Sequence, residues 1–393
     1  MATTTPNFGW SVPTSSDLVK NGATAIETLG DSIDASLVDL KGGTTGQVLS
    51  KASGTDMDFT WTAAATGSSN VAGKNLVLNS NYSIWQRGTS IAATGTGTTY
   101  GADRWQPYRN AAGGTMSRQV TGDTTNLPFI QYCARIARDS GNTSTTAILL
   151  DSAFESVNSI PYAGKTVTLS FYARAGANYS ATSNALVATL LSGTGTDQNS
   201  LSGFTGASNV IQQTATLTTT WQRFSYSATV GTTATQLGVR FSFTPTGTAG
   251  AADYYEVTGV QVEAASSVTA YSPNAATYQQ ELAACQRYYE RWSPETTNLA
   301  FAGFNNSTTN GYHTWHFHTK KRTSPTISIS AAGDFAVRTP GNTNVTCSAF
   351  STIGNTTDGI WMSTTVASGL VSGNGNFLVN TNANAYIQAD SEL

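Results

Sequence analysis

Charged side chains are scarce in this sequence, since Lys, Arg, Asp and Glu make up 11% of its 393 residues, against roughly 25% in ordinary globular chains. The net charge is −3 without any run of Lys or Arg, so we expect no nucleic-acid partner. No apolar run approaches the roughly 20 residues of a membrane span, which predicts no membrane insertion. The start MATTTPNFGW lacks the basic and apolar regions of a signal peptide, so we expect synthesis in a cytoplasm without a cleaved signal.

Cysteine and histidine are also rare, with three of each. Cys133, Cys285 and Cys347 are odd in number and far apart, which excludes a disulfide framework and a zinc pattern. No cofactor is expected. Gly, Ser, Thr, Asn and Ala are abundant instead, and they favour short strands joined by turns over long helices. At this length the sequence predicts a mainly β protein of two or three domains.

Residues 1–70 differ from the rest because they contain a helical pattern over 17–40. Apolar residues recur there at alternating steps of three and four, although Gly22 and Ser36 interrupt them. One helix cannot bury such a stripe by itself, so the pattern favours a short parallel coiled coil in an oligomer over a helix lying on its own domain. The predicted trimerisation residues are Val19, Ile26, Leu29, Ile33 and Leu40.

Residues 74–275 contain many short segments with a period of two, such as TVTLSFYARA and WQRFSYSATV, separated by Gly/Thr/Ser turns. This spacing predicts a two-sheet β-sandwich of the jelly-roll kind. Residues 276–294 carry the strongest helical pattern after residue 70, and we interpret them as a connecting helix. Residues 295–393 again contain strand-like pieces with turns between them, which predicts a C-terminal β-sandwich domain.

The stretch ELAACQRYYERW in the connecting segment could be an active site or a structural joint. Leu282, Cys285, Tyr289 and Trp292 form one helical stripe. A catalytic cysteine needs a histidine nearby, and all three histidines lie in HTWHFHTK instead. Cys285 is therefore interpreted as a small buried hydrophobic residue.

Several stretches resemble bacteriophage tail-fibre and receptor-binding proteins. TPNFGW with DLVKNGATAIETLGDSIDASL is similar to their N-terminal attachment segment, and GTTGQVLSKASGTDMDFTW to a piece of fibre shafts. NLVLNSNYSIWQRGTS, YGADRW and ELAACQRYY resemble a carbohydrate-binding-like jelly roll with its exit helix. The resemblance implies a homotrimer in the virion, made in the host cytoplasm. It would be held to a tail or baseplate protein through the N-terminus and would bind a host surface polysaccharide.

Exposed aromatic rings flanked by polar groups are the side chains expected to bind a sugar. Trp85 and Trp105 are interpreted as packing residues. The N-terminal attachment implied by the resemblance makes residues 295–393 the candidate receptor-binding tip, because they lie farthest along the chain. Loops on a rigid sheet are where binding residues concentrate. The ligand-binding candidates are Tyr108, in an expected loop, and Trp315, Trp361 and Tyr386 beside the loops of the tip.

Metal sites have weak support. On a strand, His316 and His318 share a face, and three such strands at a trimer axis would give six imidazoles, as in some phage fibres. The alternative is an ordinary surface strand. A structural calcium, known in sugar-binding relatives, would need carboxylates such as Glu256 and Glu263, but the opening strand NLVLNSNYS has none.

Enzymatic activity is not expected. Asp139, Asp151, Glu155, Asp253 and Glu256 are scattered, whereas glycosidases oppose two acids. No repeated rungs of a parallel β-helix occur, as a glycan-depolymerising tailspike would often show. We therefore expect a non-enzymatic adhesin. The alternatives left open are a decoration fibre of capsid or tail without a dedicated receptor, and a depolymerising tailspike.

Overall fold

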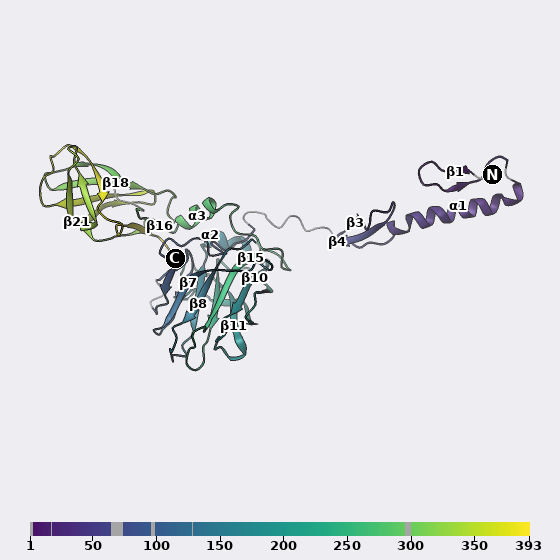
Figure 1. The fold of residues 1–393 in the computed structure, drawn as a ribbon, viewed down its shortest axis with the longest axis horizontal. Helices are drawn as coiled ribbons and strands as arrows, with labels where there is room; N and C mark the ends of the chain where they lie inside the picture. Colours follow the sequence, from purple (N-terminus) through teal and green to yellow (C-terminus); the bar gives the residue numbers. More distant parts are fainter. Residues whose placement is uncertain (1–2, 17, 64–73, 96–98, 128, 295–299) are drawn as a thin grey trace. The chain divides into compact units, whose positions relative to one another are not determined.

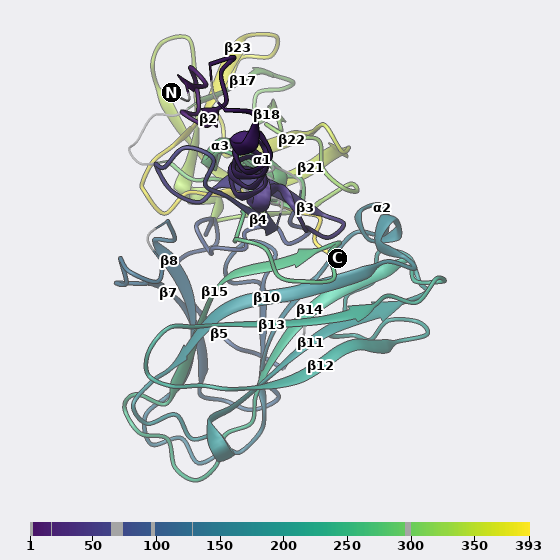
Figure 2. The ribbon, with the colours of Figure 1, turned by 90° about the vertical axis from the view of Figure 1, so that its right-hand side faces the viewer.

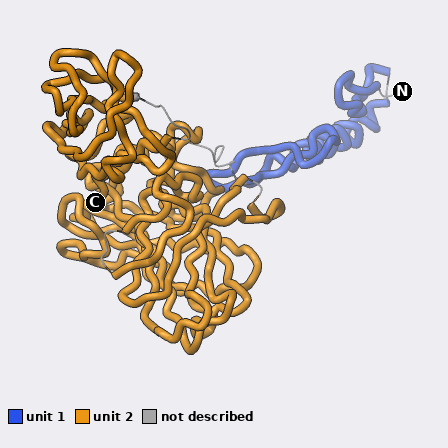
Figure 3. Tube along the Cα trace, turned by 60° about the vertical axis from the view of Figure 1, so that its left-hand side comes forward, with its two compact units in different colours: residues 1–68 blue, residues 69–393 orange. Residues whose placement is uncertain are grey.

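The computed structural model describes residues 3–16, 18–63, 74–95, 99–127, 129–294 and 300–393. Contacts between residues divide the chain into two compact units, Met1–Ser68 and Ser69–Leu393 (Figure 3). The sequence places the boundary of the first segment between residues 70 and 74, and residues 64–73 lie outside the described residues. The sandwich and the C-terminal domain, which the sequence predicts as separate domains, belong to one compact unit.

The first unit is built around helix α1 (Gly22–Leu37), which two 3-10 turns extend to Val19–Leu40. No residue of α1 is buried within this unit. Of the predicted seam, Val19 is 97% exposed and Ile26 64%, while Leu29 and Ile33 are half-buried. Two hairpins complete the unit, β1 (Thr3–Thr4) with β2 (Ser11–Val12) and β3 (Gln47–Lys51) with β4 (Phe59–Ala63). No helix in the described ranges is long and apolar enough to cross a bilayer.

The second unit begins with an antiparallel sandwich of two sheets, as the sequence predicts. Figure 2 shows β10 and β13 of one sheet beside β11, β12 and β14 of the other. The chain crosses between the sheets repeatedly, which is the connectivity of a jelly roll. The first sheet has the order β13 (Gln222–Thr229), β10 (Thr166–Ala175), β15 (Tyr254–Glu263), β8 (Tyr132–Arg138), β7 (Gly114–Val120), β5 (Ser90–Ala92). The second has the order β12 (Ser208–Thr216), β11 (Ala185–Gly193), β14 (Gln236–Phe243), β9 (Ile148–Ala153), β6 (Gln106–Tyr108).

The core of the sandwich lies between these sheets. The alternating residues Val167, Leu169, Phe171 and Ala173 of β10 are all fully buried, which confirms the period of two as the core-facing pattern. Trp105 is also fully buried and packs against Tyr82 and Phe241, so its interpretation as a packing residue is confirmed.

The C-terminal domain is a closed six-stranded barrel, so the prediction of a second sandwich is wrong (Figure 1). Its longest strand, β21, carries two bulges that bend it. Gly303 lets neighbouring strands approach closely, because a Cβ there would collide with the carbonyl of Tyr312. The strand order is β17 (Ala300–Asn305), β18 (Asn310–His316), β22 (Gly359–Val366), β21 (Asn344–Asn355), β20 (Phe335–Arg338), β23 (Gly375–Asn380), which returns to β17.

The connecting segment is half helix and half strand. Helix α3 (Tyr278–Gln286) begins at Thr277, whose hydroxyl accepts a hydrogen bond from the Gln280 amide. The helix predicted to continue through Trp292 ends earlier, and Tyr289–Trp292 forms strand β16. It pairs with β24 (Ile387–Asp390), which in turn pairs with β19 (Thr326–Ile329). Tertiary pairing therefore overrides the helical stripe over its last turn.

The last described residues return to the sandwich and join it to the barrel. Glu392 forms an ion pair with Arg104, which is almost fully buried in the sandwich, and Asn199 donates to the Leu393 carbonyl at 3.0 Å. The Leu393 side chain packs against Ala153 and Phe204. These contacts explain why residues 69–393 behave as one unit.

Candidate functional site

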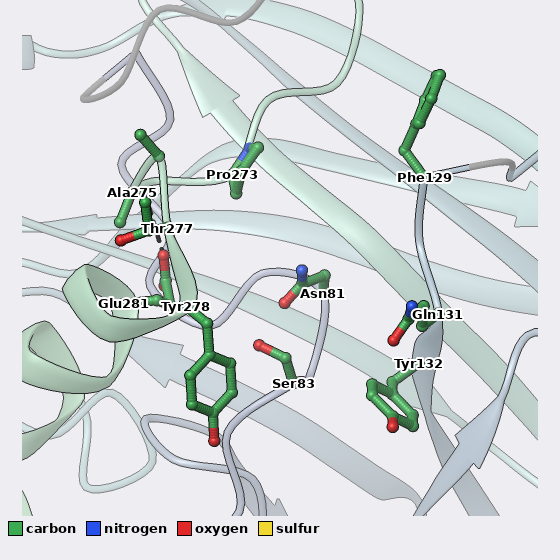
Figure 4. A pocket seen from close by; sticks show the side chains of 11 residues that line it. Asn81, Ser83, Phe129, Gln131, Tyr132, Pro273, Ala275, Thr277, Tyr278 and Glu281 are labelled. Carbon is green, nitrogen blue, oxygen red and sulfur yellow. Dashed lines mark hydrogen bonds between the residues drawn. The ribbon is translucent and has the colours of Figure 1, made fainter.

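Two adjoining hollows form a groove on the sandwich, beside the start of α3. Their volumes are about 430 and 610 Å³, within the range of small-molecule sites. Asn81, Phe129 and Pro273 line both hollows, so the hollows are continuous, and Figure 4 shows the first of them. The remaining walls come from the turn after Asn79, the start of β8, the outer faces of β10 and β13, and the segment 270–281.

Aromatic rings stand along the whole groove. Phe129 is 92% exposed and Tyr278 56%, while Tyr132 and Tyr172 are half-buried. The rings come from different elements: Tyr278 is the first residue of α3, Tyr132 the first of β8, and Tyr172 lies within β10. A solvent-facing ring offers a π face with negative charge density, against which the C–H groups of a flat apolar ligand surface can pack.

Polar side chains without protein partners lie between these rings. Asn81, Ser83 and Gln131 face the first hollow (Figure 4), and their side chains make no hydrogen bond to the described part of the chain. An amide supplies two donors and an acceptor, and a hydroxyl supplies one donor. The groove therefore combines apolar faces with open hydrogen-bonding groups.

The turn that presents Asn81 and Ser83 is rigidly held. Asn79 and Tyr82, on either side of the Ser80–Asn81 pair, have φ of 49° and 54°, a conformation uncommon for residues other than glycine. The Asn79 amide compensates by donating to the carbonyls of Ile84 at 2.8 Å and Asp103 at 3.0 Å. With its backbone fixed in this way, the turn is preorganised to bind a ligand.

Glu281 holds the backbone of the groove walls together. Its carboxylate accepts hydrogen bonds from the backbone amides of Asn79 and Ala275, so it ties two walls of the groove together. Burial raises its pKa above the usual range. Glu281 is the one carboxylate among the described residues that line either hollow, so the groove lacks the opposed pair of acids that glycoside hydrolysis needs.

The other acids considered from the sequence are mostly engaged by arginines. Asp253 pairs with Arg138 at 2.8 Å with both side chains fully buried. Asp139 is exposed. The further pairs are Asp151 with Arg240, Glu155 with Arg287, and Glu256 with Arg135 and Arg174.

The carboxylates considered for calcium are also paired. Glu256 bridges its two arginines, and Glu263 lies 3.1 Å from Lys74 Nζ. Across the described ranges no group of three His, Cys, Asp or Glu side chains could hold a metal ion.

The four ligand-binding candidates from the sequence are dispersed. Tyr108 lies in strand β6 rather than in a loop and is half-buried. Trp315 is 4% exposed and packs inside the barrel, so it offers no ring face to a ligand. Tyr386 is half-buried, with the Arg291 guanidinium 4.2 Å from its ring centre.

Trp361 is the candidate that the structure leaves open to solvent, at 41% exposure on β22. It stands in a row across three strands of the barrel, 5.3 Å from the Tyr312 ring, which is itself 5.6 Å from the Phe304 ring. We call Phe304, Tyr312 and Trp361 the barrel ladder. Its role as a binding surface stays a prediction.

The three histidines have different surroundings. His313 is buried, with Nε2 3.1 Å from the Thr364 hydroxyl, and burial lowers its pKa to about 4. His316 is exposed on β18. His318 lies beyond the end of that strand, with Nδ1 2.6 Å from Glu290. Glu290 also binds the buried Lys321, so one imidazole of the suggested His-x-His site already has a carboxylate partner.

The sequence does not reveal the groove, because its residues are up to 200 positions apart. Asn81 lies in the motif NLVLNSNYSIWQRGTS and Tyr278 in the helical pattern of residues 276–294, but neither pattern marks them as binding residues. The proline directly before Phe129 in NLPFIQY is a turn signal, and it is a cue in the sequence that this ring does not lie within a regular strand.

Comparisons with known proteins give structural likeness alone. No family model matches the chain, and no curated protein matches it. Among solved structures, one described as "CBM4 structure and function" shares 23% identity over 33% of this chain and 70% of that chain, with a TM-score of 0.24. The xylan-binding CBM22-1 domain of Paenibacillus barcinonensis Xyn10C shares 13% identity over 50% of this chain and 98% of that chain, at a TM-score of 0.27.

A phage protein also appears among these neighbours. The enzymatically active domain of tailspike protein 4 from bacteriophage CBA120 shares 13% identity over 48% of this chain and 21% of that chain, with a TM-score of 0.31. Scores this low carry no functional inference. The sandwich is therefore assigned from its own strand order, and the function is argued from the groove.

Proposed function

We propose that this chain is the subunit of a trimeric, non-enzymatic phage tail fibre or receptor-binding protein that attaches the virion to a host surface glycan. The observation that carries the proposal is the groove, where exposed rings alternate with amide and hydroxyl groups that lack protein partners. Phe129 and Tyr278 would pack against the C–H faces of sugar rings. Asn81, Ser83 and Gln131 would exchange hydrogen bonds with sugar hydroxyls.

The oligomer is supported by α1. Val19 and Ile26 are exposed within their own unit, yet they belong to an apolar stripe of heptad spacing, which becomes stable when helices pack together. Attachment of the N-terminal segment to a tail or baseplate protein rests on the resemblance of residues 1–70 to fibre attachment segments. Three grooves on one particle would convert weak single-site binding into avidity on a dense glycan surface.

Binding without cleavage is supported by the carboxylates. Glu281 is buried and bound to two backbone amides, and no second described carboxylate lines the groove beside it. The proposal therefore predicts that host polysaccharide is retained intact. Release of new reducing ends by the purified protein would favour the depolymerising tailspike instead.

The test compares two double variants on an array of bacterial surface glycans. Phe129→Ala with Tyr278→Ala should abolish binding, whereas Tyr312→Ala with Trp361→Ala should bind like the wild type. The second variant is the matched control, because it also removes two rings that solvent can reach, the exposed Trp361 and the half-buried Tyr312. The reverse result would move the binding site to the barrel ladder, within the candidate tip at 295–393. Absence of binding by the wild type to any glycan or to host cells would favour a decoration fibre.

A further inference from the structure

An arginine without a carboxylate partner lines the second hollow. Arg223 is the second residue of β13 and lies directly opposite Tyr172 of β10. Its Nη2 donates to the Thr269 carbonyl at 2.6 Å and to Ser170 Oγ at 3.2 Å, and its guanidinium lies 5.3 Å from the centre of the Tyr172 ring. These contacts hold the charged group at the wall of the groove.

The charge of Arg223 is not neutralised by the protein. No carboxylate of the described residues forms an ion pair with it, whereas Arg135 and Arg174 on the same sheet share Glu256. Its Nε is buried and its Nη2 is bound by Thr269 and Ser170, whereas its Nη1 makes no hydrogen bond to the described residues and is left to donate to an incoming acceptor.

Acids around the groove are bound to other groups, among them Glu263, which pairs with Lys74 and accepts from Thr269. Glu281 is bound to two backbone amides in the first hollow. Asp123 accepts hydrogen bonds from the side chain and the backbone of Asn126. These hydrogen bonds and the positive charge of Arg174 lower the pKa of Asp123. The second hollow therefore presents a positive charge beside aromatic and amide groups.

We infer that this hollow takes a sugar that bears a carboxylate, such as a uronic or nonulosonic acid residue of the host glycan. A carboxylate can accept charge-assisted hydrogen bonds from the Nη1 of Arg223, and the sugar ring would lie beside Tyr172 and Phe129. Asn126 and Asn81, which line the same hollow, would form hydrogen bonds with the hydroxyls of the sugar. This inference rests on the proposed function of the groove and specifies its ligand class.

The experiment measures affinity for pairs of oligosaccharides that differ in one group. Oligogalacturonate is compared with its carboxyl-reduced form, and sialyllactose with lactose. The carboxylated member of at least one pair should bind roughly tenfold or more tightly, and its affinity should fall as salt is added. Arg223→Gln should remove this preference, and Arg223→Lys should keep part of it.

Lys165→Gln is the control, because Lys165 is exposed, lines neither hollow and also carries one positive charge. It should leave the preference unchanged, and thermal melting should show all three variants folded. Equal binding of charged and neutral glycans through the groove would overturn the inference while the proposed function stands. The same holds for a preference for sulfated glycans alone. A folded wild type whose binding is unaffected by the loss of Phe129 and Tyr278 would overturn the proposed function itself.

Discussion

Arg287 binds Glu155 at two points, Nε to Oε1 at 2.9 Å and Nη2 to Oε2 at 3.1 Å. The arginine follows the last residue of α3, and the glutamate, 3% exposed, precedes helix α2 (Ser156–Ser159) of the sandwich. Two parallel hydrogen bonds fix orientation as well as distance. The segment Glu281–Trp292 is thus a joint, tied to the sandwich by this pair and, through β16, to the three-stranded sheet that β16 forms with β24 and β19.

Arg287→Ala should destabilise the folded chain by about 2 kcal/mol, because it leaves the buried Glu155 carboxylate without its cation. Lys320→Ala is the matched control, since its pair with Asp358 is exposed and 3.5 Å long, and it should change stability by less than about 0.5 kcal/mol. Denaturant unfolding measures both. Equal effects of the two substitutions would show that the pair does not stabilise the joint.

Cys285→Ala and Cys285→Ser should reduce stability and leave glycan binding intact. Cys285 is fully buried, and burial raises the pKa of its thiol, which opposes formation of a reactive thiolate. The alanine variant should cost about 1 kcal/mol, and the serine variant somewhat more because its hydroxyl enters an apolar site. A folded serine variant that no longer binds cells would mean that the joint has a chemical role.

The buried His313 should contribute a loss of stability as the pH drops from about 6.5 to about 4. Burial lowers the pKa of His313 to about 4, whereas an unfolded histidine titrates near 6.5. The unfolded chain therefore binds more protons between these values, and folding becomes less favourable as the pH falls. From pH 7 to pH 5 this group should remove roughly 2 kcal/mol.

His313→Gln should flatten that pH dependence, measured by denaturant unfolding at pH 5 and pH 7. His316→Gln serves as the control because His316 is exposed, and it should follow the wild type. If the His313 variant loses as much stability on acidification as the wild type does, the buried imidazole is not responsible.

The purified chain should have the mass of a trimer in light scattering, and Ile26→Asp with Ile33→Asp should reduce it to a monomer. Charges buried in an apolar helix seam cost several kcal/mol each. Thr24→Asp lies on the opposite face of α1 and should leave the trimer intact. A monomeric wild type would contradict the predicted coiled coil.

The structure also changes how the candidate tip at 295–393 can be tested. A chain truncated after Trp292 would lose β24, the partner of β16, and the Glu392 that binds Arg104. Such a truncation would disturb the sandwich as well as remove the barrel. Substitutions in the barrel ladder therefore give a cleaner answer on whether the tip binds glycan.

Local patterns in the sequence were enough to predict several elements. The alternation along Thr166–Ala175 predicts a strand, and the heptad spacing around Ile26 predicts a helix; both elements are present, although the strand is buried on its polar face as well, at Thr168 and Ser170. These patterns succeed because a strand or helix repeats its buried face at a fixed period. Burial of Cys285 follows from the same logic, although the helix that carries it ends at Gln286.

Contacts distant in sequence were decided by the tertiary structure. Tyr289–Trp292 is a strand because β24, nearly 100 residues later, pairs with it. The C-terminal strands close into a barrel because β21 is bulged and Gly303 leaves room for its neighbour. The groove forms where Asn81, Phe129 and Tyr278 converge, and whether a ring faces solvent or core depends on what packs over it. The sequence alone determined which segments could form strands or helices and which residue types were present, while the folding of the sheets decided which side chains meet.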